Sequence, residues 1–133
     1  MADTLTRHAE AVWQAVVPTL PGFTVEVLPS IDSTSSELMR RARSGLMEPG
    51  LLTAEDQTAG RGRRGKGWHS KPGQSPTFSI ALPLAPASWS GLSLAVGVSL
   101  AHSLHTDVRL KWPNVLWLQQ RKLGGVLVES ATS

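Results

Sequence analysis

The stretch from Gln57 to Ser70, QTAGRGRRGKGWHS, sets four glycines among four cationic side chains. Glycine inside a helix or a strand costs about 0.5–1 kcal/mol relative to alanine, so this stretch is predicted to be a loop. An apolar strand pattern, GLLTAE, precedes it at 50–55, and a second one, TFSIAL, follows it at 77–82. The chain is therefore expected to fold around a sheet in which a basic, glycine-rich loop connects two strands.

The rest of the chain supplies helices and further strands. Apolar residues at 5–17 have helical spacing, and those at 23–27 alternate as in a half-buried strand. A mostly apolar helix, weakened by Gly97, is expected at 90–104 and should pack across the sheet. Strands are expected at 108–112, 115–119 and 124–130, the last two joined by a turn at 119–122. This order predicts an α+β fold with a mixed or mainly antiparallel sheet and packed helices.

A second helix is predicted within DSTSSELMRRARSG. Thr34 is expected to be its N-cap, with Glu37 three residues later completing a capping box, and Gly45 its C-terminal stop. A chain of 133 residues suits one domain, because single domains cluster at about 100–150 residues.

Composition narrows the possible functions. The chain has no cysteine, which excludes disulfides and thiolate metal sites and suits a reducing, cytoplasmic setting. Its apolar runs are shorter than the roughly 20 residues that span a bilayer, so no membrane association is expected. His102 and His105 have no third ligand nearby, so we predict a solvent-facing pair at a helix end and no metal site.

The cationic residues are concentrated in the loop and predict an anionic ligand. Five of the 13 lysines and arginines lie there: Arg61, Arg63, Arg64, Lys66 and Lys71. Gly60, Gly62 and Gly65 satisfy G-x-G-x-x-G, but neither a helix nor an acidic residue about 20 positions later follows, which argues against a dinucleotide site. No Gly-Lys-Ser/Thr of a P-loop is present. The alternatives left are a loop that closes over a phosphate or carboxylate and a plain solvated surface loop.

Four motifs occur in a fixed order: DST at 32–34, QTAGRGRRG at 57–65, KWPN at 111–114 and RKLGGVLVE at 121–129. Together they resemble the catalytic domain of biotin protein ligases, a class II synthetase-like fold, from about Val25 onward. The resemblance implies an enzyme that joins biotin to ATP, with Mg²⁺ brought by the nucleotide, and gives biotinyl-5′-AMP. Biotin would then pass to a lysine of the biotin carboxyl carrier protein domain of a carboxylase. A homodimer is compatible with this resemblance.

The resemblance also implies site residues, carried over by motif. The catalytic residues would be Arg63, which steadies the adenylate, and Lys111, which bridges the biotin carboxylate and the α-phosphate. Biotin would be bound by Ser33, Thr34, Gln57, Gly60, Arg61, Gly62, Arg63 and Lys111. The loop facing ATP and the adenylate would include Arg61, Arg63, Arg64 and Trp68. The plainer interpretations are a helix cap and turn for Ser33 and Thr34, a surface lysine for Lys111 and a core position for Trp68.

The chain departs from the family pattern in two places. Val115 stands where the family has an aspartate after KWPN, so a negative charge that the family places near Lys111 is missing. The family domain also continues beyond a VES segment, so 1–133 is expected to be a single, partial catalytic domain. Neither a DNA-binding winged helix nor a C-terminal β domain is expected. Alternative functions are a partial biotin-binding fragment, a lipoate ligase, or a nucleic-acid-binding module that uses the arginine-rich loop, although no nucleic acid is expected.

Overall fold

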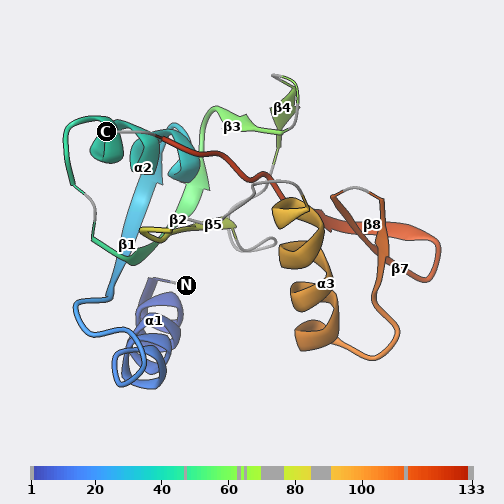
Figure 1. The fold of residues 1–133 in the computed structure, drawn as a ribbon, viewed down its shortest axis with the longest axis horizontal. Coiled ribbons are helices and arrows are strands. Elements are labelled where there is room, and N and C mark those ends of the chain that lie inside the picture. The colour runs from blue at the N-terminus through green and yellow to red at the C-terminus, as the bar shows by residue number, and fades with distance from the viewer. Residues whose placement is uncertain are drawn as a thin grey trace. The chain divides into compact units, whose positions relative to one another are not determined.

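The computed structural model describes residues 2–46, 48–62, 64, 66–69, 77–84, 91–112 and 114–131. The chain forms two compact units. Unit 1 comprises Met1–Arg61, Gly65–Leu84 and Ser130–Ser133, and unit 2 comprises Gly62–Arg64 and Ala85–Glu129. Figure 1 labels most of the elements of both units, which are described separately below.

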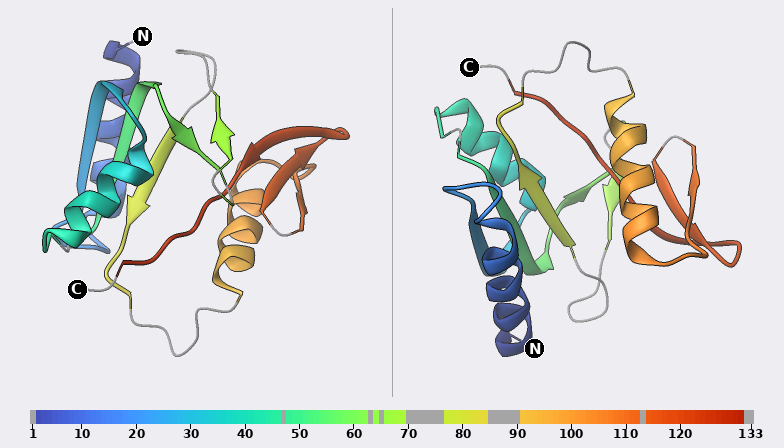
Figure 2. Two further views of the ribbon diagram at one scale, coloured as in Figure 1. Left: turned by 90° about the horizontal axis from the view of Figure 1, so that it is seen from above. Right: turned by 60° about the horizontal axis from the view of Figure 1, so that its bottom comes forward.

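Unit 1 is built on a three-stranded sheet in the order β1-β2-β5. Strand β1 (Thr24–Ile31) pairs in parallel with β2 (Gly50–Gln57), which pairs antiparallel with β5 (Thr77–Ala81). Helix α1 (Ala2–Val16) and helix α2 (Thr34–Arg43) cover opposite faces of this sheet (Figure 2). Leu52 and Ala54 of β2 are buried. Because α2 is the crossover between two parallel strands, its N-terminus follows directly from the carboxyl end of β1.

The start of α2 differs from the prediction. Ser33, not Thr34, is the N-cap: its backbone is extended (φ −157°, ψ 130°) and its hydroxyl accepts the Ser36 N–H at 3.2 Å. The predicted capping box is also wrong, since the carboxylate of Glu37 instead accepts hydrogen bonds from arginines one turn further along α2. The hydroxyl of Thr34 is engaged by the sheet below, which leaves the capping role to the residue before it.

The end of α2 is as predicted. Gly45 adopts φ +96°, and its N–H donates to the Ala42 carbonyl at 3.1 Å while the Leu46 N–H donates to the Arg41 carbonyl at 2.9 Å. These two bonds form a Schellman motif, which needs a left-handed residue where glycine is least strained.

The basic loop between β2 and β5 contains a short hairpin. Strand β3 (Gly60–Arg61) pairs antiparallel with β4 (Gly67–Trp68), with Gly60 opposite Trp68. A Cβ on Gly60 would lie 2.4 Å from the Trp68 carbonyl oxygen and 2.5 Å from Gln57 Nε2. Gly60 is therefore required here by the close approach of its neighbours.

Unit 2 packs helix α3 (Leu92–Leu104) against an antiparallel sheet of β6 (Arg109–Lys111), β7 (Val115–Leu118) and β8 (Arg121–Gly125). Its core contains Ala101, Val108 and Leu116. Gly97, predicted to weaken the helix, has a packing role, since a Cβ there would meet Leu110 Cδ1 at 2.8 Å. His102 and His105 are exposed, as expected of a pair at the end of this helix.

The last strand is displaced from its predicted range of 124–130. Gln119 and Gln120 have φ of 50° and 61°, the backbone of a two-residue hairpin turn whose twist matches its strands. So short a turn lets β8 begin at Arg121, opposite Leu118, and the strand runs to Gly125. Beyond it, the Val126 N–H donates to the Asn114 carbonyl and Asn114 Nδ2 donates to the Val126 carbonyl, both at 2.9 Å.

The α+β fold with mixed and antiparallel sheets is thus confirmed. Within the described ranges, none of the helices has the length and apolarity needed to cross a membrane.

Candidate functional site

Polar side chains from three elements of unit 1 meet at the N-terminus of α2. Gln57 Oε1, at the end of β2, accepts the Thr34 N–H at 2.9 Å and the Thr34 hydroxyl at 3.2 Å. The Thr34 hydroxyl also lies 2.7 Å from the Ser79 hydroxyl of β5. Since Thr34 donates its one hydroxyl proton to Gln57, Ser79 is the donor in this pair. Thr34 is 2% exposed, so the bonds hold a buried residue in one orientation.

The amide orientation of Gln57 follows from the same bonds. Its oxygen must face Thr34, because a backbone N–H can only donate. Its Nε2 donor is therefore directed elsewhere, and lies 2.5 Å from the position of a Cβ on Gly60. Gln57 consequently joins the start of α2 to the start of the basic loop.

Ser33 is buried beside this pair. Its side chain is 1% exposed, accepts the Ser36 N–H and lies 3.1 Å from the Ser35 hydroxyl. The hydroxyl of Ser33 thus both caps the helix and belongs to a polar cluster.

The basic loop contacts the first turn of α2 through Arg61. Its Nε donates to the Ser36 hydroxyl at 2.7 Å and its Nη2 donates to the Ser35 hydroxyl at 3.2 Å. We call the set Ser33, Thr34, Gln57, Gly60 and Arg61 the α2 site. It combines neutral hydroxyl and amide groups with one guanidinium, a combination suited to a neutral polar ligand that carries an anionic part.

An ion-pair network flanks the α2 site. The two hydrogen bonds from Arg40, followed by that from the Ser33 N–H, lower the pKa of Asp32 to about 2. Hydrogen bonds from Arg41, then Arg40, lower the pKa of Glu37, and Arg41 also pairs with Glu26 at 2.8 Å. The lowered pKa values keep Asp32 and Glu37 ionised near neutral pH.

The other predicted residues lie in unit 2 or in the hairpin. Lys111 is exposed on β6, and its Nζ lies 4.6 Å from the centroid of the Trp117 ring, a cation–π contact. Gly62 is half-buried, and Arg64 is exposed with φ 58°. Trp68 is half-buried in β4. Arg63 lies outside the described residues.

The structure thus brings together five of the predicted residues, those of the α2 site. It adds Ser79, Ser35 and Ser36, which the sequence analysis did not single out. A signal for Ser79 existed, because it is a polar residue inside the apolar strand pattern TFSIAL. Its importance depends on Thr34 lying opposite it, 45 residues away, which no local pattern contains.

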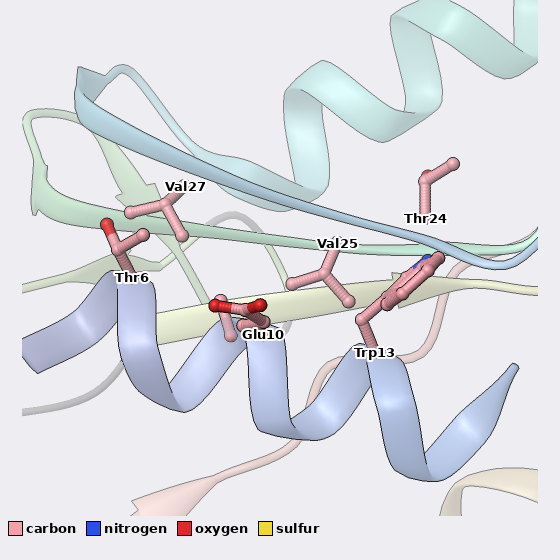
Figure 3. A pocket seen from close by; sticks show the side chains of 7 residues that line it. Thr6, Glu10, Trp13, Thr24, Val25 and Val27 are labelled. Carbon is pink, nitrogen blue, oxygen red and sulfur yellow. The ribbon is translucent and has the colours of Figure 1, made fainter.

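A separate pocket of about 530 Å³ lies between α1 and β1 (Figure 3). Trp13 and Glu10 of α1 and Val25 and Val27 of β1 are among its lining residues, and Trp13 Nε1 donates to the Phe23 carbonyl at 3.0 Å. It lies on the face of the sheet opposite α2, so its lining residues are not those of the α2 site. Within the described ranges, no three His, Asp or Glu residues are grouped so as to hold a metal ion.

Comparison with known proteins identifies the family. Residues 27–133 match the biotin/lipoate A/B protein ligase family. The bifunctional ligase/repressor BirA of Escherichia coli is 46% identical over 117 residues, a match that covers 83% of this chain and 36% of that protein. The biotin–[acetyl-CoA-carboxylase] ligase of Mycobacterium tuberculosis is 35% identical over 118 residues, covering 80% of this chain and 44% of that one.

A solved structure shares the fold. The biotin acetyl coenzyme A carboxylase synthetase of Helicobacter pylori, with bound biotinylated ATP, superposes with a TM-score of 0.67 at 31% identity. The match covers 81% of this chain and 55% of that one, so the chain spans between about a third and a little over half of these relatives. The resemblance inferred from the four motifs is confirmed, and the chain belongs to the biotin/lipoate A/B protein ligase family.

Proposed function

We propose that this chain carries out ATP-dependent ligation of biotin to a carrier protein through biotinyl-5′-AMP. The observation that carries the proposal is the α2 site, where residues of two separate motifs, DST and QTAGRGRRG, join in one hydrogen-bonded cluster. Relatives named as biotin ligases, and a related structure with bound biotinylated ATP, support biotin as the substrate.

The α2 site would bind the ureido and tail region of biotin. The ureido group is neutral and polar, so it needs directional donors and acceptors. Ser33, Thr34 and Gln57 offer hydroxyl and amide groups whose orientation is already fixed by their neighbours. Gly60 and Arg61 would bring loop backbone against the ligand, with the Arg61 guanidinium tethered to α2. Gly62 would extend the same backbone.

The cations would serve the adenylation step. The biotin carboxylate would attack the α-phosphorus of ATP, forming the acyl–phosphate bond and breaking the α–β phosphoanhydride bond, with pyrophosphate as the leaving group. Mg²⁺ brought by ATP would offset the negative charge of the phosphates. Two anions must approach each other, so cations lower the barrier. Lys111 would bridge the carboxylate and the phosphate, Arg63 would steady the adenylate, Arg64 would add positive potential and Trp68 would flank the nucleotide.

The second step and the setting belong to the same proposal. The adenylate would transfer biotin to a lysine of the biotin carboxyl carrier protein domain of a carboxylase, with AMP as the leaving group. ATP and such carriers are available in the cytoplasm, where we expect the reaction to occur. A homodimer is compatible with this function.

Mass spectrometry tests the proposal directly. The chain is incubated with biotin, ATP and Mg²⁺, and biotinyl-5′-AMP is measured, with lipoate in place of biotin as the matched control. We expect an adenylate from biotin only, and a loss of about 100-fold in its rate of formation for Lys111→Ala, as for removal of other groups that stabilise developing charge. Formation of lipoyl-AMP alone would favour the lipoate alternative. Absence of both adenylates, together with salt-sensitive binding to a single-stranded oligonucleotide, would favour a nucleic-acid module.

A further inference from the structure

Arg40 lies about two turns along α2 from Ser33 and holds Asp32, the residue before Ser33. Arg40 Nη1 donates to Asp32 Oδ2 and Arg40 Nη2 donates to Asp32 Oδ1, both at 2.9 Å. Two parallel bonds of this kind match the planar guanidinium to the carboxylate and fix the direction of both groups. Arg40 Nε and Nη2 also donate to Glu37 Oε1 at 3.0 and 2.8 Å, which anchors the guanidinium on its own helix.

Asp32 in turn holds two parts of the candidate site. Its Oδ1 accepts the N–H of Ser33, the buried N-cap, at 2.7 Å. Its backbone carbonyl accepts the Ala59 N–H at 2.7 Å, immediately before Gly60. A shift of Asp32 would therefore move both the start of α2 and the start of the basic loop.

We propose that Arg40 is a positioning residue for biotin binding, which acts by clamping Asp32 and thereby fixing Ser33 and the strand entry at Gly60. This inference rests on the proposed function of the α2 site. Arg40 acts through Asp32, so its contribution is geometric.

The exposure of the Arg40–Asp32 pair helps to distinguish a positioning role in biotin binding from a role in stability alone. The side chains of Arg40 and Asp32 are 48% and 45% exposed, and exposed ion pairs usually contribute little to global stability. A positional error in a hydrogen-bonding site, however, weakens each ligand bond that depends on it. The inference thus predicts an effect on ligand affinity that is larger than the effect on unfolding.

Isothermal titration of biotin into the wild-type chain and its variants tests this inference. Arg43→Gln is the matched control, because Arg43 is on the same helix, is exposed and has no ion pair within the described ranges. We expect Arg40→Gln to raise the Kd for biotin about 3- to 10-fold, the range that follows from weakening one or two hydrogen bonds. Arg43→Gln should leave the Kd within twofold of wild type, with both melting temperatures nearly unchanged.

Two further variants keep the test decisive. Arg40→Lys retains the charge without the paired bonds, so its Kd should lie between those of wild type and Arg40→Gln. In an Asp32→Asn background, Arg40→Gln should add little, since the two residues act as one unit. If the wild-type chain binds biotin, two results would overturn the inference. One is equal Kd values for Arg40→Gln and Arg43→Gln, and the other is additive effects of Asp32→Asn and Arg40→Gln on the Kd. A wild-type chain that binds no biotin would overturn the proposed function as well.

Discussion

The predicted site residues of unit 1 and those of unit 2 are held in different ways. In unit 1, the α2 site is a cluster in which buried Ser33 and Thr34 have named hydrogen-bond partners. In unit 2, Lys111 is exposed and rests on the face of Trp117. Recognition of a neutral polar ligand depends on direction, which requires a fixed network. An ammonium that stabilises charge developing during a reaction needs to be near that charge but needs no fixed hydrogen-bond direction. A flexible lysine side chain resting on an aromatic ring meets this requirement.

The largest expected effect comes from adding one methyl group to the α2 site. A Cβ at residue 60 would lie 2.4 Å from the backbone oxygen of Trp68, so Gly60→Ala must displace the hairpin. We expect a destabilisation of about 3 kcal/mol, at the upper end of overpacking effects, and loss of measurable biotin binding. Thermal unfolding and biotin titration measure the two effects.

Gly67→Ala is the matched control in the same hairpin. Among the described residues, its Cβ would meet only His69 Nε2, at 3.7 Å, an ordinary contact. Both the melting temperature and the Kd should stay close to wild type. Equal behaviour of the two variants would mean that the hairpin does not need the close approach seen at Gly60.

The second prediction divides the two roles of Gln57. Gln57→Leu removes the acceptor of the Thr34 N–H, and leaving a buried donor unpaired costs about 1–3 kcal/mol. Gln57→Glu keeps an acceptor for Thr34 but replaces the Nε2 donor by an oxygen. We expect Gln57→Leu to lower both the free energy of unfolding and the affinity for biotin, and Gln57→Glu to lower chiefly the affinity. Urea unfolding measures the first quantity and biotin titration the second. If Glu binds biotin as well as wild type, the Nε2 group has no part in recognition.

A smaller effect is expected in unit 2. Trp117→Leu removes the ring beneath Lys111 Nζ, a contact worth about 0.5–1 kcal/mol at an exposed position. The rate of adenylate formation should fall about two- to fivefold, while the Kd for biotin stays unchanged. Trp117→Phe, which keeps an aromatic face, should recover part of the rate. If Trp117→Leu changes the affinity for biotin but not the rate of adenylate formation, the distinction between the α2 site and Lys111 does not hold.

The motifs and the Schellman stop at Gly45 could be read from sequence because each is a local pattern. The N-cap was misassigned to Thr34 because Ser33 and Thr34 are both good caps, and the choice between them depends on Gln57 and Ser79, 23 and 45 residues away from Thr34. The range predicted for the last strand was too far along the chain, because two non-glycine residues, Gln119 and Gln120, form the turn before β8. Turn propensity favours glycine or asparagine at such positions, so the sequence predicted a turn at 119–122 but not that Gln119 and Gln120 alone would form it.

The smallest effect is the response of unit 1 to acid, which arises from the carboxylates around α2. The folded-state pKa of Asp32 is about 2, below its ordinary value of 3.8, mainly because of Arg40. The stability that it contributes is therefore complete above about pH 4 and is lost as the pH falls towards 2. Glu37 acts in the same direction through Arg41 and Arg40, and Glu26 pairs with Arg41.

Urea unfolding at a series of pH values checks this response. The free energy of unfolding of wild type should fall more steeply between about pH 4 and 2 than that of Arg40→Gln, in which Asp32 titrates closer to its unfolded value. Arg43→Gln should follow wild type, and added salt should narrow the difference, because the pair is exposed to solvent. Parallel acid curves for all three proteins would show that the clamp on Asp32 is too weak in solution to distinguish the α2 site from the looser surroundings of Lys111.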